Sequence, residues 1–346
     1  MAYDALMLVS FGGPEGPDDV LPFLQNVTRG RGIPPERLAE VAEHYQHFGG
    51  VSPINAQCRE LLAALRPVLD EAGVSLPLYW GNRNWTPLLV DTLARMRDDG
   101  VRRALAFVTS PYGSYSSCRQ YLTDIEVARE TVGPEAPVVD KIRHYHDHPG
   151  YIEPHADAVR HAFATLSDVE GARLVFTAHS VPSTMEATSG PDGGRYTAQL
   201  RETARLVAAA AGVTEWDLVW QSRSGPPHVA WLSPDINDHL AALAAAGVPG
   251  VVVSPIGFIS DHLEVVWDLD TEAAATAAKL GLRYARAATP GTDPRFVAMV
   301  RDLVLERLDP AVPRARLGAV PVWDACPVAC CHPPARPTSS PRPSTR

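Results

Sequence analysis

The sequence lacks the long apolar run that a membrane-spanning helix requires. No stretch reaches the roughly 18 apolar residues that mark such a helix. The first residues, Met-Ala-Tyr-Asp, also lack the positive charges that precede the apolar core of a secretory signal. The short apolar stretch after them is more typical of a first β-strand. We therefore expect a cytoplasmic protein without integral membrane association.

Positive charge and nucleotide-binding motifs are also scarce. The 31 Lys and Arg residues face 40 Asp and Glu residues, so the formal net charge is −9. A field of this sign disfavours nucleic acids and anionic membranes, and a substrate with several carboxylates would need cationic side chains within its own site. Neither Gly-x-Gly-x-x-Gly nor Gly-x-x-x-x-Gly-Lys-Ser/Thr occurs at the positions that would predict a nucleotide site. We expect no nucleotide cofactor and no nucleic acid partner.

Short apolar runs alternate with amphipathic helical stretches along the whole chain. The runs lack the period-2 alternation of half-exposed strands, and this is typical of strands buried on both faces of a parallel sheet. Repeated strand–helix units predict an α/β fold with helices on both faces of the sheet. The expected strands lie at residues 5–9, 76–80, 104–108, 137–139, 173–177, 217–220, 251–254 and 282–285.

The expected strands fall into two groups of four, which predicts two similar halves. We expect a first domain at residues 1–168, a second at 169–310 and a cysteine-bearing segment at 311–332. Residues 333–346 consist mainly of Pro, Ser, Thr and Arg. Because such a composition offers almost no apolar surface to bury, we expect this tail to be disordered.

His179 directly follows the expected strand at 173–177, within the stretch Thr-Ala-His-Ser. In open α/β sheets, ligands bind outside the carboxyl ends of the strands. This position makes His179 a candidate for binding or catalysis. The alternative is a histidine that is hydrogen-bonded at a strand end and serves structure only.

Three carboxylates follow the expected strand at 251–254. Glu264, Asp268 and Glu272 are spaced four residues apart in a helix expected to begin near Asp261. This spacing stacks them along one helix face, where like charges repel. Such an arrangement suits a path for a divalent cation or a site of proton uptake. A solvated acidic face is the alternative.

Two further segments offer polar groups in glycine-rich loops. Ser52 precedes Pro53 and is expected to cap the helix that follows. Arg29 and Arg31 lie in the stretch Thr-Arg-Gly-Arg-Gly. Guanidinium groups bind carboxylates bidentately, so this loop is a candidate clamp for an acidic substrate. A solvated turn is the alternative.

The cysteines favour a metal centre over disulfides. There are five of them, and three fall within six residues near the end of the chain. An odd, clustered set is a poor disulfide framework. Zinc and a [2Fe–2S] cluster both need four ligands. The three clustered cysteines are Cys326, Cys330 and Cys331, and the candidates for the fourth ligand are Cys58, Cys118 and His332.

Five segments in order along the chain resemble signatures of the ferrochelatase family, whose members insert ferrous iron into a porphyrin. They are SFGGP at 10–14, GGVSP at 49–53, FTAHSVP at 176–182, WQSRSGP at 220–226 and the stretch 255–268. The resemblance implies two Rossmann-like domains, each a parallel sheet flanked by helices, with a porphyrin cleft between them. It further implies that His179 and Glu264 face each other as the catalytic and metal-binding pair, and that Asp268 and Glu272 continue an acidic line toward them.

The resemblance also implies porphyrin contacts. Ser52 and Tyr121 match porphyrin-binding positions of the compact bacterial branch, and Arg29 and Tyr45 match further contacts. Two positions depart from the family. Phe11 stands where some bacterial members have a tyrosine, and a phenyl ring cannot ligate iron. Thr28 stands where some relatives have an arginine, which removes one possible propionate contact.

Some members of the family carry a [2Fe–2S] cluster on one internal and three C-terminal cysteines. By this resemblance Cys118, Cys326, Cys330 and Cys331 are the expected ligands, and Cys58 remains a plain buried thiol. The cluster is then a resident cofactor, whereas Fe²⁺ is a substrate.

The implied activity is insertion of Fe²⁺ into coproporphyrin III, which yields coproheme in heme biosynthesis. The expected partners are these two substrates, with transient contact to the preceding and following enzymes of the pathway. Three alternatives remain open. They are a protoporphyrin IX ferrochelatase, a cobalt or nickel chelatase for another tetrapyrrole, and a non-catalytic metal-binding module.

Overall fold

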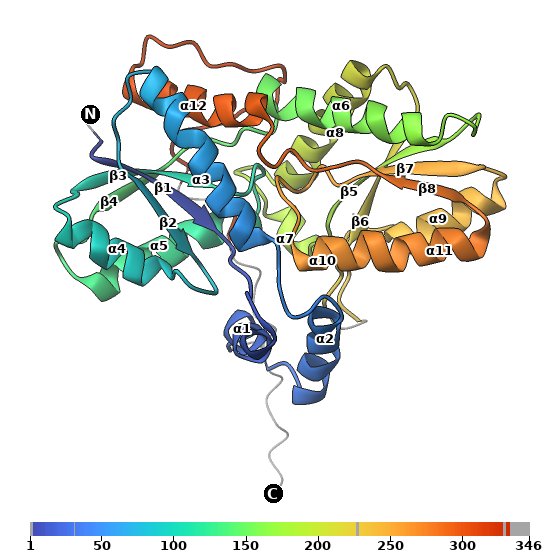
Figure 1. Cartoon of the computed structure of the whole chain (residues 1–346), viewed down its shortest axis with the longest axis horizontal. Coiled ribbons are helices and arrows are strands. Elements are labelled where there is room, and N and C mark those ends of the chain that lie inside the picture. Colours follow the sequence, from blue (N-terminus) through green and yellow to red (C-terminus); the bar gives the residue numbers. More distant parts are fainter. Residues whose placement is uncertain (1–2, 31, 226–227, 328–329, 333–346) are drawn as a thin grey trace, which may run out of the picture.

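The computed structural model describes residues 3–30, 32–225, 228–327 and 330–332. These residues form two four-stranded parallel sheets that lie side by side along the molecule (Figure 1). The first sheet has the order β2–β1–β3–β4 and the second β6–β5–β7–β8. The predicted α/β class with two Rossmann-like domains is confirmed, and each expected strand overlaps an observed one. The strands are β1 (Ala5–Ser10), β2 (Leu78–Asn82), β3 (Arg103–Val108), β4 (Val138–Lys141), β5 (Arg173–His179), β6 (Trp216–Gln221), β7 (Gly250–Ser254) and β8 (Arg283–Arg286).

The central strands are buried on both faces. All six residues of β1 and all five of β7 are buried. On β1, Leu6 and Leu8 point toward α3 (Ile54–Glu71), whereas Met7 and Val9 pack with the opposite layer. That layer consists of α4 (Leu89–Asp98) and α5 (Gln120–Val132). Because apolar helices cover both faces, the strands need apolar side chains at every position.

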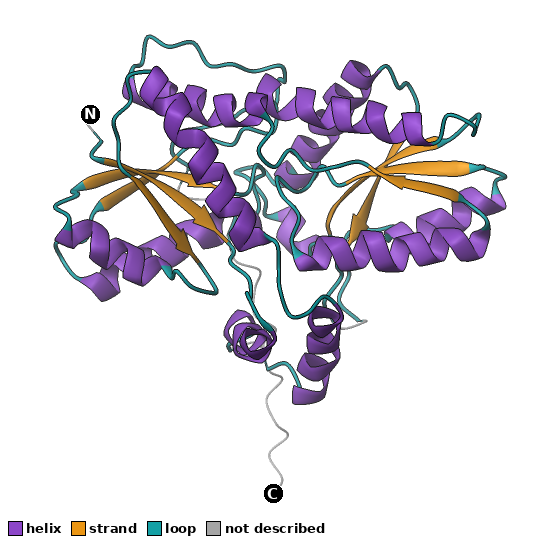
Figure 2. Cartoon of the chain, viewed as in Figure 1, coloured by secondary structure: helices purple, strands orange, loops and turns teal. Residues whose placement is uncertain are grey.

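The second sheet is covered in the same way (Figure 2). One face packs against α6 (Pro149–Thr165) and α8 (Arg195–Ala211). The other packs against α9 (Ile236–Ala245), the π-helix η3 (Val266–Ala273) and α11 (Ala274–Leu280).

Two helices join the halves. α6, which lies within the expected first domain, packs against α8 and β7 of the second sheet. α12 (Pro294–Leu308) packs against both α6 and α3, so the buried side chains of the halves form one continuous cluster. The limits 1–168 and 169–310 stay a proposal, and this packing favours a boundary before α6. The expected disordered tail at 333–346 lies outside the described residues.

A small lobe projects below the two sheets (Figure 1). It consists of η1 (Pro17–Asp19), α1 (Val20–Val27) and α2 (Pro35–His47). The lobe also touches the second domain, because the ring of His44 stacks on Trp267 with centroids 3.9 Å apart and planes inclined by 9°. It therefore contacts the helix that carries the acidic residues.

The chain after α12 runs back over the surface, and its described residues form no helix or strand. Arg316 donates to Asp147 at 2.8 Å, and the backbone N–H of Ala319 donates to Glu202 at 2.6 Å. These bonds fasten residues 309–332, hereafter the C-terminal segment, to the loop before α6 and to α8.

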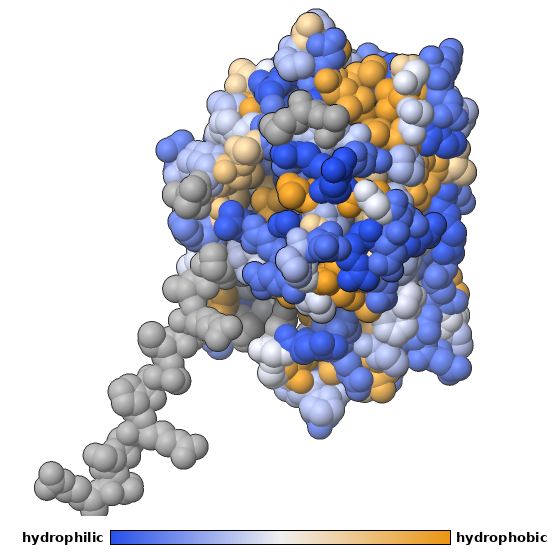
Figure 3. All heavy atoms as spheres, turned by 90° about the vertical axis from the view of Figure 1, so that its left-hand side faces the viewer, coloured by the Kyte–Doolittle hydropathy of each residue, from blue (hydrophilic) through white to orange (hydrophobic). Residues whose placement is uncertain are grey.

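Within the described ranges, no helix is both long and apolar enough to cross a membrane. The face of the first domain seen in Figure 3 intersperses hydrophilic with hydrophobic residues. Val127 and Val138 of that domain are among the exposed large apolar side chains of the molecule.

Candidate functional site

His179 is the last residue of β5, at the carboxyl edge of the second sheet. Its Nδ1 lies 2.5 Å from the carbonyl oxygen of Ser180. Nδ1 must donate its proton to that oxygen, which leaves Nε2 with a free lone pair in the neutral imidazole. Burial lowers the pKa of His179, and the bond to Ser180 offsets this only in part. The ring is therefore neutral near pH 7 and can accept a proton at Nε2.

Glu264 lies on the short helix α10 (Leu263–Val265) and faces His179. Its Oε2 lies 3.7 Å from Nε2 of His179, and the two side chains keep 42% and 36% of their surface exposed. The structure thus brings the two residues predicted as a catalytic pair together and leaves them open to a ligand. Although the side chain is partly exposed, desolvation by the surrounding protein raises the pKa of Glu264 to about 7.

Asp268 follows Glu264 along the same helix. Its carboxylate accepts hydrogen bonds from the hydroxyl of Ser222 and, at 3.2 Å, from the amide of Gln221. Burial, and then the negative charge of Glu264, raise the pKa of Asp268 to about 7 against the effect of these bonds. Both carboxyl groups therefore hold a proton more readily than free carboxyl groups, and ionisation of Glu264 disfavours ionisation of Asp268. The sequence placed Gln221 and Ser222 in a family motif but predicted no role for them.

The third acidic residue, Glu272, has a different partner. It is exposed and accepts a hydrogen bond from Nε1 of Trp267 at 2.9 Å. The α-helical turn ends at Val265, and the chain continues as the π-helix η3 from Val266 to Ala273. The expected α-helical stack of three carboxylates is therefore only partly correct. Glu264 and Asp268 interact with each other, whereas Glu272 lies at the surface end of the line.

Ser52 does not cap α3. The helix begins at Ile54, and Pro53 occupies the N-cap position with a near-helical backbone and no side-chain cap bond. Ser52 is therefore one residue too early to cap the helix, and the capping prediction is wrong. Its buried hydroxyl instead accepts a hydrogen bond from the backbone N–H of Leu263 at 3.4 Å. Ser52 thus links the first domain to the residue before Glu264.

Tyr121 lies in the first turn of α5 and is only 5% exposed. The guanidinium carbon of Arg83 lies over the ring of Tyr121, 4.5 Å from the ring centroid. The same carbon lies 5.7 Å from the ring centroid of Phe11. Arg83 pairs with Asp124. The sequence did not single out Arg83, because its partners are distant along the chain. It brings a cation to the predicted porphyrin contact at Tyr121.

The remaining predicted porphyrin contacts lie on the lobe. Tyr45 of α2 packs against Phe23 at 5.8 Å between ring centroids. Burial raises the pKa of Tyr45, and the negative charges of Glu264 and Asp268 add to this effect. Arg29 is exposed after α1, and Arg31 lies outside the described residues.

Four of the five cysteines come together, and Cys58 lies apart. Cys118, on the π-helix η2 (Tyr115–Arg119), and the adjacent Cys330 and Cys331 are buried. The Sγ atoms of Cys330 and Cys331 lie 3.6 Å apart. Hydrogen bonds from the thiols of Cys118 and Cys330 hold the pKa of Cys326 well below its usual range. Cys58 lies on α3 within the apolar core.

The surroundings favour the thiolate at Cys326 and Cys331, whereas hydrogen bonding to Cys326 raises the pKa of Cys118 and of Cys330, and burial adds to this effect. The backbone N–H of Gly190 donates to Sγ of Cys331 at 3.1 Å. Lys141 is 8% exposed, and its ammonium donates to the carbonyl oxygen of Ile142 at 2.9 Å. Among the described residues no carboxylate pairs with it. A buried ammonium needs a counter-charge, and the positive charge of Lys141 favours the anionic form of Cys326.

A third group of potential metal ligands was not predicted. The ligand atoms of His146, Asp147 and Glu202 lie within 4.8 Å of one another, and all three residues are buried. Arg316 pairs with Asp147 at 2.7 Å, and the backbone of Ala319 donates to Glu202. Because these carboxylates are already bound by the C-terminal segment, we interpret the group as its anchor.

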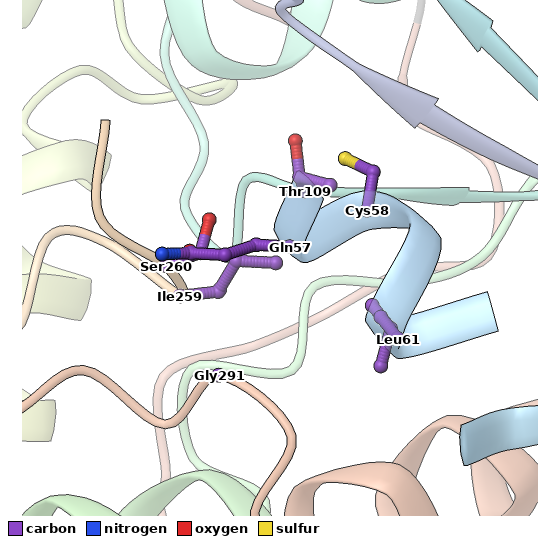
Figure 4. Close-up of a pocket in the computed structure, with 7 residues that line it drawn as sticks. All are labelled: Gln57, Cys58, Leu61, Thr109, Ile259, Ser260 and Gly291. Carbon is purple, nitrogen blue, oxygen red and sulfur yellow. The ribbon is translucent and has the colours of Figure 1, made fainter. Parts of the chain in front are cut away.

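Neither of two described cavities suits a porphyrin. One lies between the domains and has about 10 Å³ of room, which holds at most one water molecule. Figure 4 shows Gln57 and Cys58 on one side of it and Ile259 and Ser260 on the other. The other opens between Arg160 and Arg173, at the amino end of β5 and away from His179. The predicted porphyrin cleft stays a prediction.

Comparison with known proteins identifies the family of the chain. The family model described as Ferrochelatase matches residues 3–308. The chain is 58% identical to the coproporphyrin III ferrochelatase of Nocardia farcinica over 99% of this chain and 100% of that one. It is 54% identical to the enzyme of the same name from Streptomyces griseus subsp. griseus, over 99% of this chain and 95% of that one.

A solved structure of SirB from Bacillus subtilis with Fe³⁺ is similar in fold, with a TM-score of 0.51 and 14% sequence identity. The match covers 88% of this chain and 95% of SirB. The two parallel sheets, the paired His179 and Glu264, and the family match across both domains lead to one conclusion: the chain belongs to the ferrochelatase family and is a metal chelatase.

Proposed function

We propose that this chain inserts ferrous iron into coproporphyrin III to yield Fe-coproporphyrin III, a step of heme biosynthesis in the cytoplasm. One observation carries the proposal. Neutral His179 holds its free Nε2 3.7 Å from Glu264, at a site open to a ligand. The relatives named coproporphyrin III ferrochelatases support this choice of porphyrin.

The reaction exchanges two pyrrole N–H protons for one Fe²⁺, so two protons must leave the ring. His179 is placed to accept a proton at Nε2, because Nδ1 is committed to Ser180. Glu264 and Asp268, each with a pKa raised to about 7, take up and release protons at neutral pH. No oxidation or reduction is needed.

We propose that iron approaches along the carboxylates. Glu272 is exposed, Asp268 is held by Ser222, and Glu264 lies next to His179. Carboxylate oxygens bind divalent cations without the tight affinity of thiolates, so the ion can move onward. This order gives the cation a route from the surface to the imidazole.

We propose Ser52 and Tyr121 as porphyrin contacts, with Arg29 and Tyr45 as further ones. The macrocycle would lie between the lobe, the first domain and His179. Coproporphyrin III carries four propionates, and Arg83 above Tyr121 supplies a cation for one of them. The phenyl ring of Phe11 offers no axial ligand to the product.

The deciding experiment compares kcat/KM for coproporphyrin III and protoporphyrin IX with Fe²⁺ under anaerobic conditions. We expect a clear preference for coproporphyrin III. A preference for protoporphyrin IX would overturn the proposed substrate. Turnover with Co²⁺ or Ni²⁺ and another tetrapyrrole, but not with Fe²⁺, would identify a related chelatase. Metal binding without turnover would identify a binding module.

We also propose that Cys118, Cys326, Cys330 and Cys331 hold a [2Fe–2S] cluster. Pairwise contacts among the thiols support this proposal, because Cys326 interacts with both Cys118 and Cys330, and the Sγ atoms of Cys330 and Cys331 lie 3.6 Å apart. When bound, the cluster supplies a four-thiolate cross-link between the first domain and the C-terminal segment. The cysteines are separate from the His179 pair, so we assign the cluster a stabilising role.

Protein purified without oxygen should be reddish-brown and contain about two irons and two labile sulfides per chain. Cys118→Ser should bleach the protein. Cys58→Ser is the matched control, since Cys58 is equally buried but lies apart, and it should keep the colour. A colourless protein with one zinc per chain would replace the cluster with a zinc site. Transient contacts with neighbouring heme-pathway enzymes also remain a proposal.

A further inference from the structure

Residues 188–194 and the first two residues of α8, Arg195 and Tyr196, are hereafter called loop 188–196, and their shape depends on glycine. Gly190, Gly193 and Gly194 have φ of 73°, 79° and 69°, in the left-handed region. A Cβ atom on Gly193 would lie 2.5 Å from the carbonyl oxygen of Ala187, and one on Gly190 would lie 2.6 Å from Cβ of Arg195. The loop is therefore packed closely in a conformation that these glycines permit. We expect a displacement of one part of the loop to displace the residues packed against it.

One side of this loop is held by the C-terminal segment. Gly190 donates to Sγ of Cys331 at 3.1 Å, and the hydroxyl of Thr188 donates to the carbonyl oxygen of His332 at 3.3 Å. The guanidinium of Arg195 lies 4.3 Å from the ring of Trp323. These contacts tie the loop to the cysteine site itself.

The other side of the loop holds His179. Tyr196 is 5% exposed, and its backbone N–H donates to the hydroxyl of Ser189 within the loop. Its phenol donates to the carbonyl oxygen of His179 at 2.9 Å. That carbonyl belongs to the peptide between His179 and Ser180, and the next carbonyl, on Ser180, accepts the proton of Nδ1. Tyr196 therefore holds the His179–Ser180 peptide, and the next peptide along the chain supplies the carbonyl oxygen that orients the imidazole.

We propose that Tyr196 is a positioning residue for His179, and that loop 188–196 connects it to the cysteine site. An intact cysteine site holds Gly190, the loop holds Tyr196, and Tyr196 holds the His179 peptide. Loss of the site then loosens the catalytic imidazole without any change in the residues around it. The inference rests on the proposed roles of His179 and of the four cysteines.

The first test is Tyr196→Phe, which removes only the hydroxyl. We expect kcat for Fe²⁺ insertion to fall at least about fivefold, because one buried hydrogen bond is lost. KM for coproporphyrin III should stay unchanged. The iron and sulfide content and the visible spectrum should also stay unchanged, because the cysteines are untouched. Tyr151→Phe is the matched control. Tyr151 is equally buried and its phenol also donates to a backbone carbonyl, that of Ile256, so this variant should keep its kcat.

The second test asks whether the loop transmits the effect. Cys331→Ser should speed amide hydrogen exchange in residues 188–196 but not in β7, and Tyr196→Phe should then lower kcat little further. Thr188→Val removes the hydrogen bond to His332 and leaves every cysteine in place, and it should also speed exchange in this loop. This variant replaces Cys331→Ser in the test if Cys331→Ser does not fold. Full kcat in Tyr196→Phe, or fully additive losses, would overturn the proposal.

The outcomes separate this inference from its foundations. An inactive wild-type protein would refute the proposed function. A wild-type protein without iron and sulfide, in which Tyr196→Phe still lowers kcat, would refute the cluster and leave the positioning role intact. A protein with its cluster in which Tyr196→Phe keeps full kcat would refute the positioning role alone.

Discussion

The two sheets share a strand order but differ in what their carboxyl ends carry. In each sheet the strand that comes first along the chain lies between the second and the third. At the end of β1, the strand that corresponds to β5, Ser10 is fully buried and its hydroxyl accepts a hydrogen bond from the hydroxyl of Thr109, so it serves packing. At the end of β5, His179 is open to a ligand. The same backbone arrangement therefore supports structure in one half and chemistry in the other.

This difference shows that the fold supplies positions and the side chains supply function. Glu264 and Asp268, whose pKa values burial raises to about 7, belong to the second half. The first half contributes Tyr121 beneath Arg83. We therefore expect substitutions in the second half to lower kcat and those in the first half to raise KM for the porphyrin.

The largest effect should come from His179→Ala. We expect kcat to fall by about 1,000-fold, or about 4 kcal/mol of barrier, because the proton acceptor is lost. The fold should persist, since the side chain is partly exposed. His161→Ala, at an exposed histidine of α6, is the control. Activity of His179→Ala within tenfold of wild type would contradict the assignment of His179.

The acidic pair should show a graded loss. We expect Glu264→Gln to lower kcat by about 100-fold and Asp268→Asn by about tenfold, since Glu264 is the residue adjacent to His179. Steady-state rates with Fe²⁺ and coproporphyrin III measure both. If each variant retained its full rate, the carboxylates would be a solvated acidic face after all.

A first-domain variant sharpens the comparison. Arg83→Ala removes the cation above Tyr121, so KM for coproporphyrin III should rise by about tenfold while kcat changes less than about twofold. Arg103→Ala is the control, because Arg103 also belongs to this domain but pairs with Asp140 at the amino end of β3. A fall in kcat with unchanged KM would place Arg83 in the chemistry of the second half.

The smallest effect concerns stability. The pKa of Glu264 is raised from 4.5 to about 7 on folding, so the folded state favours the protonated carboxyl. Stability therefore falls as the pH rises from about 4.5, where the unfolded chain ionises, to about 7, where the folded state ionises, and the full penalty persists above pH 7 and is absent below pH 4.5. Glu264→Gln should raise Tm on the order of 1 °C at pH 8 and leave it unchanged at pH 4. Glu60→Gln, at an exposed position, should shift Tm at neither pH.

The strands could be predicted because burial on both faces leaves a clear mark on composition. β7, with the sequence GVVVS, cannot be confused with an exposed segment. The change from α- to π-helix after Val265 leaves no such mark, because it depends on backbone register and not on residue type. The packing of α6 on the second sheet could not be predicted either, because an amphipathic pattern does not indicate which sheet a helix covers.

The site could be predicted only where residues lie close in sequence. The trio Cys326, Cys330 and Cys331 was evident from spacing, but Cys118 joined it only through the family resemblance. Arg83 directly follows β2, yet it contacts Tyr121 and Asp124 of α5, which come much later in the chain. The capping prediction for Ser52 failed because α3 begins one residue later than expected, so that Pro53 and not Ser52 occupies the N-cap position.

The position of α12 has a consequence for biosynthesis. This helix is the last element of regular structure among the described residues, yet it packs against α3 near the start of the chain and against α6 near its middle. While the ribosome is still adding residues before 294, neither of these helices has its final neighbour. We therefore expect a nascent chain that ends before α12 to expose apolar surface of both halves and to depend on chaperones until α12 has been synthesised.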